Sequence, residues 1–546
     1  MPTYFPTLSA SKSFQRLPAT LPICRRLLAD QITPVGAFLR LSAGADHAFL
    51  LESVVGGEQT ARFSFVGAKP TAVLRVKNRV ATIERPDGSL EILGRADDPL
   101  KSLQQALDSL HASPRATPAH PSPHNAPGAS VPRSASTRPS GLPFGDASGD
   151  HPSLVLPPMP FPMPRFTGGA VGFAGYDTIR CYENLPSPPP DDRGLDDLLF
   201  GIYHDMVIFD HVCNTVLVVA NARLDHDAVE APYDDACRRI DALVDLIQSP
   251  GPAVAADFDL DAAPDLPVES TFTQSAFEDA VGRCLDYILA GDIFQVVLSQ
   301  RLRARCALDP FDIYRALRVV NPSPFMFYLK GPDSILVGAS PEILCRVEDG
   351  LVTNRPLAGT RARGANPVED SQLERDLLND PKDRAEHVML VDLGRNDVGR
   401  VARPGTVNLT DVMSVERYSH VMHLSSNVTG RLAEDRTAID ALRASLPVGT
   451  VSGAPKIRAM QIIDELEPVR RGPYGGALGY LDFLGNMDTC IILRTLVLTP
   501  TQPAGTWIID MQAGAGIVAE SDPRAEYQET LNKAKALLAA VGLARN

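Results

Sequence analysis

The stretch Ile343-Leu-Cys-Arg-Val-Glu-Asp-Gly-Leu-Val-Thr353 contains two strand-like runs joined by Asp349-Gly350. Asp-Gly between alternating apolar residues is typical of a two-residue hairpin turn. A similar pair of runs, 72–76 and 80–83, flanks Lys77-Asn78. Strands joined by such short turns pair antiparallel. The hairpins therefore predict antiparallel sheets and the α+β class, not a doubly wound parallel fold.

Two glycine-rich segments from distant parts of the chain resemble each other. They are Phe166-Thr-Gly-Gly-Ala-Val-Gly-Phe173 and Tyr474-Gly-Gly-Ala-Leu-Gly-Tyr480. Glycine within a strand marks a bend or a close backbone approach. A glycine-rich corner of a sheet that is used twice would explain the similarity, and so would chance; the first interpretation is favoured.

Composition divides the chain into two halves. Residues 112–164 hold 14 of the 47 prolines, mixed with Ser, Ala, Gly and Arg. Such a segment buries too little apolar surface to offset its ordering entropy, so it predicts a disordered insert. Residues 249–269 are again rich in proline and alanine and are expected to form a linker. The expected domains are 1–248, interrupted by the insert, and 270–540.

Bulk properties exclude several classes of protein. The 546 residues are 44% hydrophobic and 22% charged, and the net charge of −14 excludes a nucleic-acid-binding protein, which needs basic patches. No apolar run approaches the roughly 20 residues that span a bilayer, and no signal peptide is evident. The eight cysteines are scattered without a CxxC pair, which indicates reduced thiols. We expect a cytoplasmic protein without a membrane partner.

The most informative segment for function lies near the C-terminus. Gln512-Ala-Gly-Ala-Gly516 predicts a glycine turn with backbone N–H groups open to an anion. A helix that begins at Pro523 then places Glu526, Glu529 and Lys533 on one face. Carboxylates beside an anion site indicate a divalent cation between them and an acidic ligand.

A second acidic helix matches the first. Asp380 is a predicted N-cap, Pro381 fits the first turn, and Asp383 and Glu386 lie three residues apart on one face. Alone, such a pair is more often a solvated face or a partner of the helix dipole. Two such helices together predict a magnesium site, because Mg²⁺ takes one or two protein carboxylates and completes its shell with water and substrate oxygens.

The glycine segment also has a rival interpretation. Gly514-Ala-Gly516-Ile-Val-Ala519 satisfies a relaxed dinucleotide-binding fingerprint. That fingerprint requires a helix to begin within the motif, so that the pyrophosphate meets its N-terminus. Here Pro523 comes first and delays the helix, so a nicotinamide-dependent dehydrogenase is not favoured.

Five further residues are candidates for a site. Gly359 and Thr360 follow a strand-like run, and a second loop, 448–456, contains Thr450. Alone, each loop is more often an ordinary turn. Arg494 lies within an apolar run that reads as a strand, and a buried arginine normally has an anionic partner. His423 lies in a similar run, where a lone histidine is usually a satisfied core residue.

Taken together, the segments resemble the chorismate-utilising enzymes, and among them the anthranilate synthase component I group. The motifs follow the order of that family through most of residues 270–535, and matches at Leu50-Leu-Glu-Ser53 and 166–183 extend the resemblance to the N-terminal half. The resembling motifs are Gly291-Asp-Ile-Phe-Gln-Val-Val-Leu-Ser299, Asn321-Pro-Ser-Pro-Phe-Met-Phe327, Ala339-Ser-Pro-Glu342, Pro356-Leu-Ala-Gly-Thr-Arg361, Ala385-Glu-His-Val-Met-Leu-Val-Asp-Leu-Gly-Arg-Asn-Asp397, Val448-Gly-Thr-Val-Ser-Gly-Ala-Pro-Lys-Ile-Arg-Ala-Met460 and Gln512-Ala-Gly-Ala-Gly-Ile-Val518.

The resemblance implies a fold of two large antiparallel β-sheets packed as a sandwich, with helices outside and the active site in a cleft. It makes 1–248 a regulatory domain and 270–540 a chorismate-binding catalytic domain. The implied reaction is Mg²⁺-dependent amination of chorismate at C2 with loss of the C4 hydroxyl, followed by elimination of pyruvate to give anthranilate. This is the first step of tryptophan biosynthesis.

Residue roles follow from the resemblance by matched position. The implied Mg²⁺ ligands are Glu386 and Glu529, supported by Asp383 and Glu526. The implied catalytic residues are Glu342, as the acid for the departing hydroxyl, His423, for pyruvate elimination, Gln295, near the nucleophile, and Thr360. The implied chorismate contacts are Gly359, Thr360, Thr450, Tyr474, Arg494, Gly514, Ala515, Gly516 and Lys533, of which Tyr474 and Arg494 hold the enolpyruvyl carboxylate.

Two positions separate this chain from its sister enzymes. Aminodeoxychorismate synthases of the best-known type carry a lysine where this chain has Ala358, and isochorismate and salicylate synthases carry one where it has Gln295. Without either lysine, free ammonia is the expected nucleophile. The alternatives that remain are those sister synthases and a chorismate-binding protein without catalysis, which the joint presence of the acidic residues and His423 disfavours.

Partners and regulation are also implied by the resemblance. None of the eight cysteines lies in a Gly-x-Cys-x-Gly elbow, so ammonia is expected from a separate glutamine amidotransferase subunit. The expected feedback inhibitor is L-tryptophan, bound between the domains and away from the catalytic cleft. The implied inhibitor contacts are Ser53, Pro324, Phe325 and Met326.

Overall fold

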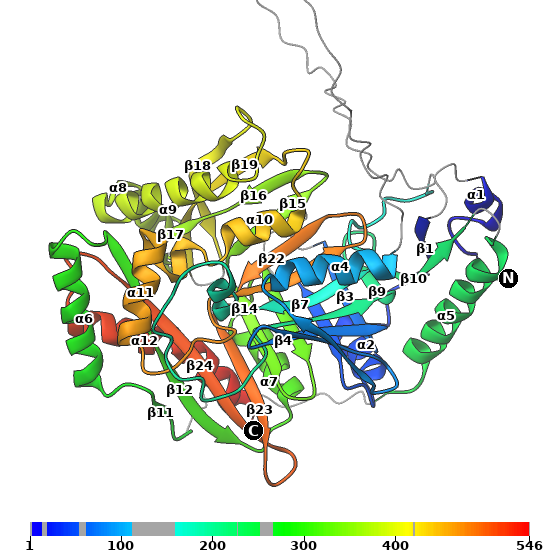
Figure 1. Cartoon of the computed structure of the whole chain (residues 1–546), viewed down its shortest axis with the longest axis horizontal. Coiled ribbons are helices and arrows are strands. Elements are labelled where there is room, and N and C mark those ends of the chain that lie inside the picture. Colours follow the sequence, from blue (N-terminus) through cyan, green and yellow to red (C-terminus); the bar gives the residue numbers. More distant parts are fainter. Residues whose placement is uncertain are drawn as a thin grey trace, which may run out of the picture.

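The computed structural model describes residues 3–13, 19–53, 62–111, 159–225, 228–251, 266–418 and 421–544 (Figure 1). Strands of the first sheet follow one another in the order β1 (Ala19–Leu28), β10 (Thr215–Leu224), β9 (Asp205–Asp210), β3 (Phe63–Ala68), β2 (Ala48–Glu52), β13 (Phe325–Lys330), β14 (Ile335–Ser340), β23 (Thr495–Thr501), β24 (Thr506–Ile517), β12 (Gln295–Cys306) and β11 (Glu269–Ser270), with β20 (Gly453–Ala454) also paired to β12.

Strands of the second sheet follow the order β17 (Leu357–Ala362), β19 (Val421–Arg431), β16 (Leu351–Asn354), β15 (Ile343–Glu348), β22 (Met487–Ile491), β21 (Ala477–Asp482), β7 (Gly169–Ala174), β8 (Leu198–Tyr203), β4 (Ala72–Lys77), β5 (Val80–Glu84) and β6 (Leu90–Arg95), with β18 (Asn408–Arg417) also paired to β19. The helices are α1 (Leu8–Lys12), α2 (Pro34–Leu41), α4 (Pro99–His111), α5 (Glu230–Gln248), α6 (Gln274–Leu289), α7 (Pro310–Val320), α8 (Pro367–Asn379), α9 (Pro381–Gly399), α10 (Ala438–Ser445), α11 (Lys456–Leu466) and α12 (Pro523–Ala544), with short 3₁₀ turns η1 (Tyr176–Cys181) and η2 (Gly449–Val451).

The predicted antiparallel pairing is confirmed in both sheets. Strands β15 and β16 form the hairpin expected from Asp349-Gly350, with Glu348 opposite Leu351. Asp349 has a φ of 48° and Gly350 a φ of 74°. Positive φ at both central residues is the geometry of a type I′ turn, whose twist matches that of the flanking strands.

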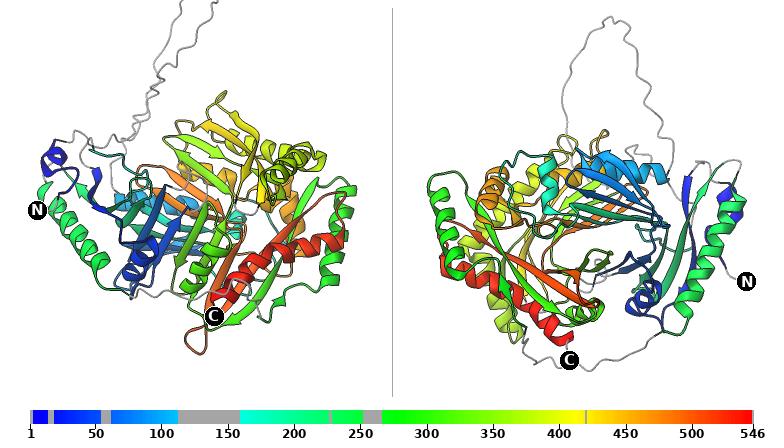
Figure 2. Two further views of the ribbon diagram at one scale, coloured as in Figure 1. Left: turned by 180° about the vertical axis from the view of Figure 1, so that it is seen from behind. Right: turned by 60° about the horizontal axis from the view of Figure 1, so that its bottom comes forward.

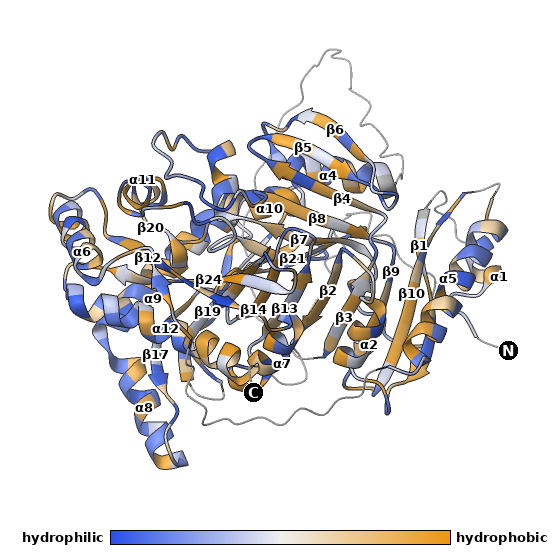
Figure 3. Cartoon of the chain, turned by 90° about the horizontal axis from the view of Figure 1, so that it is seen from below, coloured by the Kyte–Doolittle hydropathy of each residue, from blue (hydrophilic) through white to orange (hydrophobic). Residues whose placement is uncertain are grey.

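The two sheets pack face to face as a sandwich. Their inner faces share one apolar core, with Phe49 and Phe327 from the first sheet and Phe173 and Leu478 from the second. Helices α2, α5, α7 and α12 cover the outer face of the first sheet, and α4, α9 and α10 cover the second. Figure 2 shows α12 (red) lying across strands of the first sheet, and Figure 3 shows largely apolar strands such as β10, with the more polar helix α8 projecting from the body of the molecule.

Both sheets contain strands from both halves of the sequence. In the first sheet, β2 pairs with β13, so that Leu51 lies opposite Phe327. In the second, β7 pairs with β21, and Gly172 lies opposite Gly479. The two halves predicted from composition, 1–248 and 270–540, are therefore continuous through both sheets.

The echoed glycine segments are neighbouring strands, not two copies of a corner. A Cβ at Gly172 would lie 1.9 Å from the carbonyl oxygen of Leu199, and one at Gly479 would lie 2.0 Å from that of Asp488. Real Cβ atoms cannot approach backbone so closely, so the centre of the second sheet requires glycine on both strands.

The predicted insert and linker lie largely outside the described residues, which omit 112–158 and 252–265. The described end of the insert, 159–164, differs from the prediction, because Met159, Phe161 and Met163 pack against the core between the sheets. At the linker, Leu266 and Val268 pack against the core of the first sheet. Apolar side chains interspersed among the prolines account for this packing. In the described part of the chain, none of the helices is long and apolar enough to cross a membrane.

Candidate active site

The glycine segment near the C-terminus belongs to strand β24. The sequence predicted a turn here, and this prediction is wrong, because the β24–β12 ladder continues to Ile517. Gly514 lies opposite Ser299, and its carbonyl oxygen accepts a hydrogen bond from Lys533 Nζ at 2.9 Å. In an antiparallel ladder, alternate residues turn both backbone groups toward or away from the partner strand. The N–H groups of Gly514 and Gly516 therefore point away from β12.

The same alternation distinguishes the third predicted donor. Ala515 lies between the two glycines, opposite Leu298, so its N–H faces β12 and not the open edge. Among the described residues, β23 pairs with β24 only as far as Met511. Two glycine N–H groups, not three consecutive ones, are therefore available to an anion at this edge.

Helix α12 brings its acidic face to this edge. The helix begins at Pro523, as predicted. Lys533 Nζ, which bonds the carbonyl of Gly514, also lies 2.8 Å from Glu529 Oε1. Glu526 is buried, and burial raises the pKa of its carboxyl; a hydrogen bond with Ser521 opposes this shift and the nearby Glu529 carboxylate adds to it. The predicted face of Glu526, Glu529 and Lys533 thus lies along the open edge of β24.

Helix α9 approaches the same edge from the second sheet. Asp380 caps it by accepting hydrogen bonds from the N–H groups of Lys382 and Asp383, as its sequence predicted. Gln295 Nε2 donates to Glu386 Oε1 at 3.1 Å. A Cβ at Gly516 would lie 2.7 Å from Gln295 Nε2 and 3.9 Å from Glu386 Oε1. The Glu386 carboxylate therefore lies directly beside the β24 glycines.

Asp383 lies one turn before Glu386 and is held by Arg361, whose guanidinium is 2.8 Å from Asp383 Oδ2. Burial raises the pKa of Asp383, and the arginine opposes that shift. Gly359, at a φ of 64°, packs beside the Asp383 side chain, which a Cβ would approach to 3.0 Å. The role of Arg361 was not predicted, because an arginine after a Gly-Thr pair gives no signal of its own in the sequence.

The carboxylate donors fit a magnesium ion. Glu386 and Glu529 come from different helices and both reach the open edge of β24. Within the described ranges there is no group of three or more His, Cys, Asp or Glu side chains placed to hold a metal. One or two carboxylates are what Mg²⁺ typically takes from a protein, whereas zinc takes three or four side chains.

Glu342 is a buried acid between β14 and β15. The residue is 4% exposed. Thr450 Oγ1 donates to Glu342 Oε1 at 3.0 Å, and the N–H of Leu357 does so at 3.4 Å. Burial raises the pKa of Glu342 to about 8, with a smaller contribution in the same direction from Glu386, while the two donors oppose it. Glu342 is therefore protonated at neutral pH and can act as an acid.

The pH dependence of turnover should report this acid. The protonated form of Glu342 is present below its pKa of about 8 and disappears as pH rises through it, so we expect kcat to fall on the alkaline side. Thr450→Val removes a donor that favours the carboxylate. The alkaline limb of the kcat–pH profile should then move to higher pH, and a limb that stays in place or moves down would contradict this assignment.

His423 lies on β19, opposite Thr360 of β17, so Gly359 and Thr360 belong to a strand and not to the loop that the sequence predicted. Its Nδ1 lies 3.0 Å from the carbonyl oxygen of Gly359 and 3.0 Å from Thr360 Oγ1. Because a carbonyl oxygen only accepts, the contact assigns the proton to Nδ1 and leaves Nε2 as a free base. Burial lowers the pKa of His423, and the Arg494 cation lowers it further. The histidine is thus neutral at physiological pH and can accept a proton.

The sequence predicted that Arg494 lies within a strand, and this prediction is wrong. It occupies the break between β22 and β23 at a φ of 47°. Burial lowers its pKa, and Tyr418 partly opposes that shift. Among the contacts of the described residues, its guanidinium has no hydrogen bond or ion pair to a carboxylate. The anionic partner expected of such an arginine is therefore not supplied by this part of the chain.

Tyr474 lies in a glycine turn opposite this break. Its hydroxyl faces Gly514, where a Cβ would lie 3.0 Å from the oxygen. Burial raises the pKa of Tyr474 to about 12, so the hydroxyl remains a donor at all working pH values. The Tyr474 phenol therefore lies beside the β24 glycines as an available hydrogen-bond donor.

A buried ion pair behind Tyr474 was not predicted. Arg471 and Glu467 are 1% and 4% exposed and their side chains lie 2.6 Å apart. Arg471 also donates to the carbonyls of Val451 and Val297, and its guanidinium lies over the ring of Tyr474. In the sequence the pair is an ordinary i, i+4 spacing, which usually marks a solvated helix face. The structure shows that this ion pair is buried and that it packs against Tyr474, which the sequence does not indicate.

The predicted inhibitor residues lie elsewhere in the first sheet. Ser53 follows β2, and Glu52 of that strand lies opposite Met326 of β13. Met326 is buried, while Pro324 and Phe325 are half-buried. Strands β14 and β23 separate β13 from β24 in the sheet order. These four residues thus form a group apart from the one around β24.

The fold and the site together define a class of protein. Residues 147–539 match the family of chorismate binding enzymes. The chain belongs to this family, as its motifs predicted.

Individual relatives with similar sequences or structures belong to a narrower group within this family. Anthranilate synthase component 1 of Thermus thermophilus is 45% identical over 525 residues, covering 96% of this chain and 98% of the relative. That of Acetivibrio thermocellus is 42% identical over 542 residues, covering 98% of each. Among solved structures, anthranilate synthase component I from Streptococcus pneumoniae TIGR4 matches with a TM-score of 0.68 and 35% identity, covering 94% of this chain and 99% of that one. The predicted group and the α+β sandwich are confirmed.

Proposed function

We propose that this chain is the chorismate-converting component of an anthranilate synthase, which aminates chorismate at C2 and then eliminates pyruvate. The observation that carries the proposal is a buried carboxyl, Glu342, that accepts from Thr450, together with a buried histidine, His423, whose Nδ1 lies against the carbonyl oxygen of Gly359. The first step needs an acid for the departing hydroxyl and the second needs a base for a ring proton. The relatives named above support the same activity.

Each reacting group has a residue to act on it. Glu342 gives its proton to the C4 oxygen, which leaves as water while ammonia adds at C2. His423 Nε2 takes a proton from the aminated ring as the bond to the enolpyruvyl oxygen breaks, which makes the ring aromatic. Arg494, Tyr474 and the glycines of β24 hold the carboxylates in place. Glu386 and Glu529 would hold Mg²⁺, which would supply Lewis-acid stabilisation of charge on the ring carboxylate.

The nucleophile is proposed to be ammonia from a separate glutamine amidotransferase subunit. Gln295 approaches Glu386 with an uncharged amide, and Ala358 is a buried alanine on β17, so neither position supplies an amine or activates water. Several of the cysteines, including Cys24, Cys284 and Cys345, are buried, and burial raises their thiol pKa. Buried neutral thiols are poor nucleophiles.

The direct test is anthranilate fluorescence from purified chain with chorismate, Mg²⁺ and an ammonium salt. We expect fluorescence with ammonium and none with glutamine alone. Use of glutamine by the isolated chain would overturn the separate-subunit proposal. Chorismate consumption without anthranilate would point to a sister synthase, and no consumption would favour a binding protein.

The site for the inhibitor tryptophan is proposed at the paired strands β2 and β13. The enzyme is proposed to work in the cytoplasm. Two buried polar atoms there, Ser53 Oγ and Asn321 Nδ2, have no hydrogen-bond partner among the described residues. Unsatisfied buried polar atoms are uncommon in native proteins and usually await a water or a ligand. An amino acid carries the carboxylate and ammonium groups that could satisfy both.

Replacing Ser53 with phenylalanine should separate inhibition from catalysis. The phenyl ring would occupy the space beside Met326. We therefore expect the tryptophan concentration for half-inhibition to rise about tenfold or more, which corresponds to a loss of about 1.4 kcal/mol or more of binding free energy. Turnover without tryptophan should change little. The control is Ser89→Phe, at an exposed position in the β5–β6 turn. Equal inhibition of both variants would place the effector elsewhere.

A further inference from the structure

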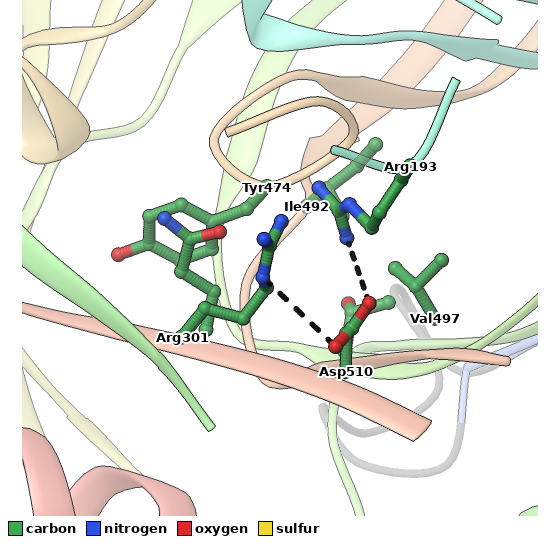
Figure 4. A pocket seen from close by; sticks show the side chains of 8 residues that line it. Arg193, Arg301, Tyr474, Ile492, Val497 and Asp510 are labelled. Atoms are coloured by element: carbon green, nitrogen blue, oxygen red, sulfur yellow. Dashed lines mark ion pairs between the residues drawn. The ribbon is translucent and has the colours of Figure 1, made fainter. Parts of the chain in front are cut away.

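A small cavity lies behind Tyr474, on the side of the first sheet. Among its lining residues are Arg193, Arg301, Thr495, Asp510 and Gln512 (Figure 4). Its volume is ≈ 10 Å³, about the room that one water-sized particle needs. Tyr474 belongs both to this wall and to the proposed chorismate site, so the cavity adjoins the active site without being part of it.

Charged side chains gather around this cavity in unequal numbers. Arg303 makes a two-point pair with Asp510, through Nε at 2.7 Å and Nη2 at 3.0 Å. Arg301 donates to Asp192 at 2.5 Å, and its Nε lies 3.9 Å from Asp510. Arg193 Nη1 is 3.6 Å from the same aspartate. Three guanidinium groups thus share two carboxylates, which leaves one positive charge uncompensated within the cluster.

The excess charge lies in a buried place. Arg301 is 1% exposed and the side chain of Arg193 is 6% exposed. Burial lowers the pKa of Arg193 to about 10, and the Arg301 cation is the next largest cause. An unpaired charge is costly in such surroundings, because neither water nor a counter-ion reaches it freely.

Polar groups at the cavity also lack partners. Arg301 Nε, a donor, makes no hydrogen bond with any described residue, whereas the unpartnered Gln512 Oε1 is an acceptor and is not a partner for an anion. Arg193 donates to the carbonyl of Arg471 through Nη2, and its Nη1 reaches Asp510 only at 3.6 Å. Figure 4 shows the guanidinium groups of Arg193 and Arg301 side by side, both turned toward Asp510.

We propose that this cavity binds one small monovalent inorganic anion, such as chloride, between Arg193 and Arg301. The anion neutralises the third guanidinium and accepts hydrogen bonds from N–H groups that the carboxylates do not use. A divalent anion would reverse the charge imbalance, and an organic acid exceeds the space. The bound ion fixes Arg193 and Arg301 behind Tyr474, and so completes the rear wall of the substrate site.

Bromide is the probe that locates the ion directly. Crystals of the full chain grown in sodium bromide should show an anomalous peak in the cavity, within contact distance of Arg193 and Arg301. Density for a water without anomalous signal, or an empty cavity, would overturn the proposal. This measurement needs no altered residue.

A second experiment tests the charge argument in solution. At equal ionic strength, the apparent Tm should be about 2 °C or more higher in sodium chloride than in sodium gluconate, whose anion is too large for the cavity. Arg193→Gln, which removes the excess charge, should abolish this difference, whereas Arg193→Lys should retain it. Equal responses of the two variants, or no difference for the unaltered chain, would refute the site. If Arg193→Gln does not fold, the bromide peak decides.

Discussion

Replacing Glu342 with glutamine is expected to lower kcat for anthranilate formation about 10²- to 10⁴-fold, the usual contribution of a positioned general acid. Glutamine matches the size of glutamic acid and can still accept from Thr450 and Leu357, but it has no proton to give to the departing C4 hydroxyl. The measurement is the initial rate of anthranilate fluorescence with chorismate and ammonium at saturating Mg²⁺. The KM for chorismate should change much less than kcat.

Two controls distinguish lost chemistry from lost structure. The raised pKa of Glu342 means that ionising this carboxyl opposes folding above its ordinary pKa, so glutamine should leave the Tm at pH 8–9 unchanged or higher. The C2-aminated intermediate bypasses the step that needs the acid, so the variant should still convert it to anthranilate. A variant that fails on the intermediate as well, or one with near-normal kcat on chorismate, would remove Glu342 from the proposed role.

Replacing Arg471 with methionine is expected to destabilise the protein by about 3–5 kcal/mol, because it leaves the buried Glu467 carboxylate without its partner. Glu467 would keep only the donors of Ser299, whose N–H and hydroxyl lie 2.8 and 2.7 Å away. The loss also removes the guanidinium that lies over Tyr474. The shift of the urea unfolding midpoint, at an unchanged m value, measures the effect.

The neighbouring arginine provides a matched control. Arg470 is only partly buried, and its side chain donates to the carbonyl of Pro189 at 3.2 Å without meeting a carboxylate among the described residues. Arg470→Met makes the same change in composition one residue away and should cost about 1 kcal/mol or less. Similar losses for both variants would show that the Arg471–Glu467 pair has no special part in stability.

Local chemistry predicted the features that depend on neighbours in the sequence. Asp380 caps α9 and Asp349-Gly350 turns the β15–β16 hairpin, because both act on backbone groups a few residues away. The sandwich itself, and most residue roles, came from the resemblance and not from spacing. The structure then brings Glu386 and Glu529 to the edge of the β24 glycines and places His423 against Gly359 and Thr360.

Other features depend on contacts between residues that are distant in the sequence, and they could not be predicted from it. The glycine spacing predicts a turn at 512–516, but these glycines lie in β24, where Lys533 donates to Gly514 and the Glu386 carboxylate lies beside Gly516. The prolines of residues 159–164 predict part of a disordered insert. In the structure, however, the ring of Phe161 packs edge-on against that of Phe5, with the ring centroids 5.5 Å apart. A sequence window cannot show which partner will cover an apolar side chain, so composition alone gave the wrong answer there.

The interleaved sheets have a consequence for how the protein is made. Strand β2 cannot pair with β13 until about 270 more residues have been synthesised, which takes about 15 to 55 s at 5–20 residues per second. Strand β7 waits for β21 in the same way. During translation the nascent chain therefore exposes apolar strand edges that attract other chains. Its yield in a cell should depend on chaperones that shield these edges until the second half emerges from the ribosome.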